Sequence, residues 1–86
     1  MTKADRFNIA SDLRRIANWM ARRQKEKLPL ILRLWGDAKS HKEVSKVIRH
    51  FVENINPDEA FKKEKRRLFF AEQVLISSIR LQSQAA

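Results

Sequence analysis

The sequence predicts an all-α fold, a small bundle of three to four helices that forms a dimer through its long C-terminal helix. The chain has 86 residues with one Gly and two Pro, too few breakers for many short strands joined by tight turns. Hydrophobic residues make up 43% and recur at the three- and four-residue spacing of helices. A chain of this length is a single domain, residues 1–86, with a thin core, so self-association is an ordinary expectation.

The first helix is expected over residues 3–26. Thr2 and Asp5 suit an N-terminal capping box, and the following apolar side chains form one helical stripe: Ile9, Leu13, Ile16, Ala17 and Met20. Pro29 fits the first turn of a helix and disfavours helical geometry before it, which predicts a second helix over residues 29–35. One long helix kinked at Pro29 remains the alternative, because the apolar stripe continues past the proline.

Two further helices are expected over residues 41–55 and 57–82. Gly36 follows an apolar run, as a left-handed C-terminal cap does, and Ser40 begins a capping box for the third helix. Asn56 and the proline after it predict the start of the fourth helix. The residues expected inside the protomer are Leu13, Ile16, Met20, Ile31, Trp35, Val44, Ile48, Phe51, Val52 and Leu68.

The second half of the last helix is apolar on nearly all sides. Such a helix needs burial on more than one face, and three short partner helices do not surround it. A second copy of the chain would cover the remainder, so we expect a homodimer. The expected self-association residues are Phe69, Phe70, Val74, Leu75 and Ile79.

The charge is strongly positive, with 19 Lys and Arg against 10 Asp and Glu, a net charge of +9. Such a field attracts nucleic acid, anionic membrane surfaces or acidic proteins. Two basic clusters are candidate binding surfaces. The first is Arg15, Trp19, Arg22 and Arg23, and the second is Lys62, Lys63, Lys65, Arg66 and Arg67.

Each cluster has two interpretations. Trp19 among arginines suits stacking on a base while the guanidinium groups bind phosphates. The same spacing also suits an indole at the core edge that is covered by arginine side chains. The second cluster is either a phosphate-binding face or a solvated helix surface.

Nothing in the sequence predicts catalytic, cofactor-binding or metal-binding residues. The chain has no Cys, which excludes disulfides and thiol nucleophiles. His41 and His50 are nine residues apart and do not share a metal through one helix. No glycine-rich phosphate loop exists, and Gly36 begins a connection too loose for a typical helix-turn-helix. The expectation is a protein that is not an enzyme.

The predicted function is therefore a non-catalytic interaction or regulatory module. It presents a basic surface to an acidic protein partner, as a homodimer. The alternative is a nucleic-acid-binding protein that uses the same basic helix faces for contacts to phosphates. No run is apolar enough to span a membrane, and with no cysteine and no apolar signal segment the cytoplasm is the expected location.

Overall fold

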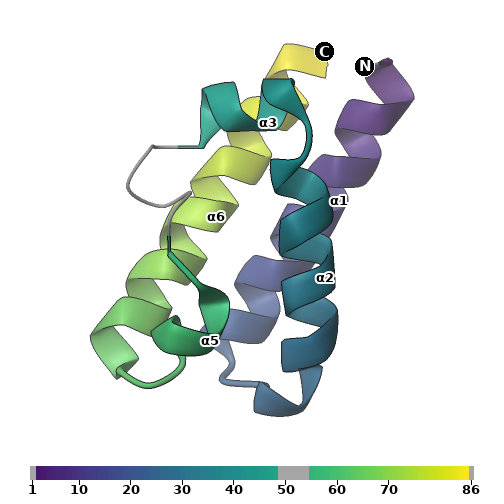
Figure 1. Cartoon of the computed structure of the whole chain (residues 1–86). Helices are drawn as coiled ribbons and strands as arrows, with labels where there is room; N and C mark the ends of the chain where they lie inside the picture. Colours follow the sequence, from purple (N-terminus) through teal and green to yellow (C-terminus); the bar gives the residue numbers. More distant parts are fainter. Residues whose placement is uncertain (1, 49–54, 86) are drawn as a thin grey trace.

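Two long antiparallel helices lie side by side through the length of the molecule (Figure 1). The computed structural model describes residues 2–48 and 55–85. Within them, α1 spans Lys3–Ala21 and α6 spans Glu64–Ala85, and α2, Leu28–Lys39, packs along α1. Both ends of the chain lie at one end of the bundle, so the C-terminus of α1 and the N-terminus of α6 meet at the opposite end (Figure 1).

Short helices complete the bundle. The 3₁₀ helix η1, Lys25–Lys27, precedes α2, while α3, Lys42–Val47, and α5, Pro57–Ala60, pack against α6. Figure 1 places α3 near the C-terminal end of α6 and α5 near its N-terminal end. The described residues contain helices and no strand, so the all-α prediction is confirmed.

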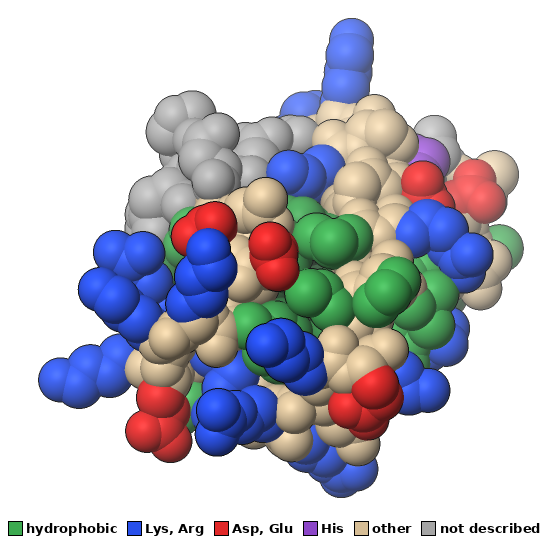
Figure 2. Space-filling model, turned by 60° about the horizontal axis from the view of Figure 1, so that its bottom comes forward, with side chains coloured by type: hydrophobic (Ala, Val, Ile, Leu, Met, Phe, Trp, Pro, Cys, Tyr) green, Lys and Arg blue, Asp and Glu red, His purple; other side chains and the backbone are tan. Residues whose placement is uncertain are grey.

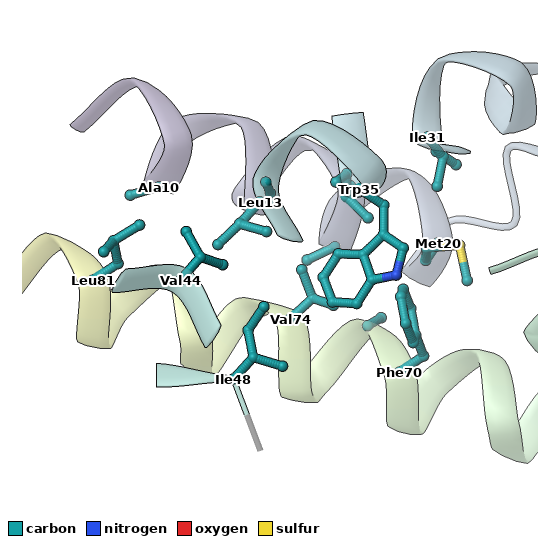
Figure 3. Packing of buried hydrophobic residues seen from close by; sticks show 14 of the residues in the cluster. Ala10, Leu13, Met20, Ile31, Trp35, Val44, Ile48, Phe70, Val74 and Leu81 are labelled. Carbon is teal, nitrogen blue, oxygen red and sulfur yellow. The ribbon is translucent and has the colours of Figure 1, made fainter. Parts of the chain in front are cut away.

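The core lies between α1, α2 and α6 (Figure 3). Trp35 of α2 packs edge-to-face against Phe70 of α6, with ring centroids 5.1 Å apart. Small residues bring α1 and α6 close together, since the Ser78 hydroxyl donates a hydrogen bond to the Ala10 carbonyl at 2.7 Å. The predicted core residues that are buried are Leu13, Ile16, Met20, Ile31, Trp35, Val44 and Ile48.

The prediction that Leu68 is buried is wrong, and two other predicted core residues lie outside the described residues. Leu68 is 46% exposed, because the face of α6 that packs on α1 lies to one side of it. Phe51 and Val52 fall in the segment that the structure does not describe.

The first helix is five residues shorter than the predicted 3–26. Its capping box is present, with Thr2 and Asp5 exchanging two hydrogen bonds of 3.1 Å. The helix ends at Ala21, and Arg23 takes a left-handed conformation with φ 56°. Pro29 then lies in the first turn of α2, so the chain breaks before the proline and one kinked helix is excluded.

The middle of the chain corrects the predictions made from Gly36 and Ser40. The second helix runs through Gly36 to Lys39 instead of ending at residue 35. Gly36 has no positive φ, so it is not a left-handed cap. The Ser40 hydroxyl donates to the Asp37 carbonyl at 2.6 Å, and the third helix, predicted over 41–55, spans Lys42–Val47 with His41 as its N-cap residue.

The predicted helix 57–82 is divided in two. Asn56 caps its start as expected, since its side chain accepts from the Asp58 amide at 2.9 Å. The chain then turns at residues 61–63 before α6 begins. The turn lets α5 pack against α2 while α6 packs against α1, an arrangement that one straight helix cannot make.

The buried face of α6 corrects part of the predicted self-association surface. Phe70 and Val74 are fully buried inside the protomer, so they are not available to a second copy. Leu75 is 38% exposed and Ile79 is 53% exposed. Residues four apart in a helix share a face, so Phe70 and Val74 lie on one face of α6 and Leu75 and Ile79 on another. The first face is buried against the rest of the protomer, and the second is left exposed.

A candidate basic interaction surface

Arg67 joins the two predicted basic clusters. Its side chain is 6% exposed, and its Nη1 donates to the carbonyls of Met20 at 2.6 Å and Ala21 at 2.8 Å. These carbonyls belong to the last turn of α1, where helices leave acceptors without partners. Arg67 therefore caps α1 from α6, and it is buried, unlike the other cations of the predicted second cluster.

The end of α1 is also closed by its own backbone. The amide of Gln24 donates to the Trp19 carbonyl at 2.9 Å, and the amide of Arg23 donates to the Met20 carbonyl at 3.2 Å. This pair of bonds is the Schellman motif, in which glycine is the usual left-handed residue. Here that position is occupied by Arg23.

These contacts gather exposed cations from two distant parts of the sequence at one end of the bundle. We call this surface the basic end. Its exposed cations come from residues 22–27 and 62–66: Arg22, Arg23, Lys25, Lys27, Lys62, Lys63, Lys65 and Arg66. Residues 22–27 and 57–66 also carry four acids, Glu26, Asp58, Glu59 and Glu64, so the excess of positive charge is four.

Figure 2 shows this end of the molecule, where Lys and Arg side chains, with Asp and Glu side chains among them, flank a small hydrophobic patch. Lys62 pairs with Glu59 at 3.2 Å, and both side chains are exposed. Lys25 and Lys27 were not among the predicted site residues. The signal that points to them is the absence of an apolar face between Arg22 and Lys27, which indicates a solvated segment.

Two cations lie over the ring of Trp19. The Arg15 guanidinium carbon lies 5.0 Å from the ring centroid of Trp19, and the Lys27 ammonium lies 5.7 Å from it. The indole is half-buried against the core, and Arg15 also pairs with Asp12 at 3.5 Å. A cation over the face of an indole is attracted to the ring. Arg15 and Lys27 therefore stabilise the packing around Trp19, and they lie over the ring that a base would stack upon.

An apolar strip lies on the outer side of α6, next to α1. We define the α6 strip as Leu68, Leu75 and Ile79, which are all exposed. A cavity of about 240 Å³ lies beside it. Its lining residues are Ala17, Asn18, Ala21, Leu68, Ala71, Glu72 and Leu75. Phe69 is 39% exposed and lines a separate cavity with Ile55 and Arg66.

The described residues contain no group of three His, Asp or Glu side chains that is placed to hold a metal ion. His50 lies outside the described residues. Two carboxylates that contact the N-terminal part of the chain have lowered pKa values. The hydrogen bond from the Thr2 amide lowers the pKa of Asp5, and the hydrogen bond from Arg6 lowers that of Glu43.

Comparisons with known proteins identify no relative from which the role of this surface could be inferred. No family model, no curated protein and no solved structure matches the chain. Within the described residues, no helix has both the length and the apolar character needed to cross a bilayer.

Proposed function

We propose that this protein is a non-catalytic interaction module that presents its basic end to an acidic protein partner. The observation that carries the proposal is the convergence of eight exposed cations from two segments about 40 residues apart in sequence. Arg67 maintains this convergence through its two bonds to α1. Such a concentrated field accelerates encounter with an anionic surface and aligns it. The cytoplasm remains the proposed location, since the chain has no cysteine.

Two features favour a protein over a nucleic acid as the partner. Phe69 is exposed and lies close in sequence to the cations of α6, and a protein partner offers apolar contacts where a phosphate backbone does not. Arg15 and Lys27 lie over the ring of Trp19, so they would have to move before a base could stack on it. The alternative, contacts to nucleic-acid phosphates through the same cations, is therefore the second candidate.

A binding comparison tests the choice of partner. An Asp- and Glu-rich peptide, duplex DNA and single-stranded RNA are each titrated into the purified protein at several salt concentrations. We expect the peptide to bind most tightly near physiological salt, with an affinity that falls as salt rises. We also expect Arg22→Ala with Lys65→Ala to weaken binding. The matched control, Lys3→Ala with Arg33→Ala, removes the same charge outside the basic end and leaves binding nearly unchanged.

The outcomes separate the candidates. Tighter binding of DNA or RNA than of the peptide replaces the proposed function with the nucleic-acid alternative. Binding of none of the three near physiological salt rejects both. Equal losses in the two double variants indicate an effect of total charge and reject the basic end as the binding surface.

The homodimer is part of the proposal, now placed on the α6 strip, which keeps Leu75 and Ile79 of the predicted surface and has Leu68 in place of Phe69. The α6 strip leaves three apolar side chains in water, which a second copy would bury. The segment Ala71–Ala85 contains one acid, Glu72, and one base, Arg80, so two copies meet there without net repulsion. An antiparallel pair keeps the two basic ends far apart.

Oligomeric state is measured by sedimentation or light scattering over a concentration series. We expect a dimer for the unmodified chain and a monomer for Leu75→Asp. Leu32→Asp is the matched control, because Leu32 is similarly exposed at 40% but lies on α2. A monomer at high concentration for the unmodified chain contradicts this part of the proposal.

A further inference from the structure

A small cavity at the basic end is lined mainly by charged side chains. It has a volume of about 140 Å³ and lies between the turn after α1 and the turn before α6. Its lining residues are Arg23, Phe61, Lys62, Glu64 and Arg67. Three cations face one carboxylate, so the cavity has a positive excess.

Arg67 supplies a cation that is held in place before any ligand arrives. Its guanidinium is almost fully buried, and its Nη1 is bonded to two backbone carbonyls of α1. Its Nη2 lies 3.9 Å from a Glu64 oxygen, a distance too long for a hydrogen bond. The Glu64 side chain is 79% exposed, so it leaves the cavity at little cost when another anion enters.

Arg23 supplies a cation at a backbone position that does not favour one. Its φ of 56° lies in the left-handed region, which costs a residue with a Cβ energy that glycine avoids. The Arg23 side chain makes no ion pair or hydrogen bond with another described residue. The fold alone therefore gives no reason for arginine at this position, and non-glycine residues in strained conformations cluster at binding and active sites.

We propose that this cavity binds one oxyanion group, a carboxylate of the acidic partner. Arg67 provides the fixed charge, while Arg23 and Lys62 close on the ligand from the two turns. The cavity of about 140 Å³ is several times the roughly 30 Å³ that one water molecule occupies in the liquid. It therefore has room for a small group such as a carboxylate. The inference rests on the proposed function, for which it names the point of attachment. A phosphate group has the same oxyanion chemistry and is separated by the test.

The decisive variant is Arg23→Gly. Glycine relieves the left-handed strain, so the melting temperature rises, whereas loss of the cation weakens peptide binding by about tenfold. The combination of higher stability and lower affinity is not produced by damage to the fold. Lys3→Ala is the matched control, since it removes one charge at the opposite end of α1 and leaves the affinity nearly unchanged. Glu64→Gln removes the competing carboxylate and strengthens binding.

The cavity is also probed directly by following backbone amide signals in NMR titrations with acetate, inorganic phosphate and the acidic peptide. We expect the amides of Arg23, Phe61 and Glu64 to shift with acetate and with the peptide. Unchanged peptide affinity in Arg23→Gly overturns the cavity inference but leaves the proposed function intact. Failure of the peptide to bind while acetate shifts these amides rejects the proposed function and retains a carboxylate site. Shifts with phosphate alone overturn the carboxylate assignment, and no shift with any probe overturns the site.

Discussion

Replacement of Arg67 by alanine should be among the most damaging single changes in α6. The substitution removes two hydrogen bonds from a charged donor, of 2.6 and 2.8 Å, to the Met20 and Ala21 carbonyls. Hydrogen bonds to charged groups contribute about 1.5–3 kcal/mol each. The Met20 carbonyl keeps its bond from the Arg23 amide, and Ala21 is exposed, so water partly replaces what is lost.

These terms give an expected loss of about 2–4 kcal/mol in the free energy of unfolding. The total for a small domain is about 5–15 kcal/mol, so the variant loses a large share. For a domain of this size each kcal/mol lowers the melting temperature by about 4–8 °C. Urea denaturation followed by circular dichroism measures the free energy, and a thermal scan gives the melting temperature.

Two comparison variants make the result specific. Arg66→Ala removes the neighbouring arginine, which is exposed, and should change stability by no more than about 0.5 kcal/mol. Arg67→Met keeps most of the buried side-chain volume while removing the donors, so it separates lost hydrogen bonding from lost packing. Equal effects of Arg66→Ala and Arg67→Ala refute the capping role. A fully stable Arg67→Met variant refutes the contribution of its hydrogen bonds.

Three other changes have expected outcomes. Gly36→Ala should stabilise the protein by about 0.5–1 kcal/mol in urea denaturation. Gly36 lies within α2, and an added Cβ would meet no atom of another described element within 4 Å. A less stable variant contradicts this expectation. The hydrogen bond from Arg6 at 2.7 Å lowers the pKa of Glu43 below its ordinary value, so the stabilisation it gives is present above the ordinary pKa and is lost as pH falls through the lowered pKa. Urea midpoints at several acidic pH values should therefore fall less in Glu43→Gln than in the unmodified chain, and parallel pH profiles argue against the bond. Trp35→Phe should change the unfolding free energy by no more than about 1 kcal/mol. The buried indole N–H has no hydrogen-bond partner among the described residues, so the gain from removing this unsatisfied donor offsets the packing that the smaller ring loses. A larger loss of stability contradicts this reasoning.

Much of the local structure is predictable from short stretches of sequence. The capping box at Thr2, the Asn56 cap and the apolar stripe through Leu13, Ile16 and Met20 all appear as expected. Each depends on residues within one or two helical turns, where spacing alone specifies the contact. Two of the wrong helix ends, at residues 26 and 35, share one cause. Glycine and proline are the usual end signals, whereas this chain ends α1 with Arg23 in the left-handed region and continues α2 through Gly36.

The candidate site was predictable in composition but not in arrangement. The two basic clusters are visible as runs of charge, yet consecutive residues point to all sides of a helix. Nothing local distinguishes Arg66, which is exposed, from Arg67, which is buried. The distinction depends on where α1 ends, because its Met20 and Ala21 carbonyls accept hydrogen bonds from Arg67.

The helix content, the caps at Thr2 and Asn56, the large core residues of α1 and α2, and the positive charge thus follow directly from the order of the residues. They do so because helical periodicity and capping are short-range effects. The buried face of α6, the capping of α1 by Arg67 and the convergence of distant cations at the basic end depend on how the helices pack. An apolar helix offers several equivalent faces, and contact with α1 selects the face of Phe70 and Val74 while leaving Leu75 and Ile79 exposed.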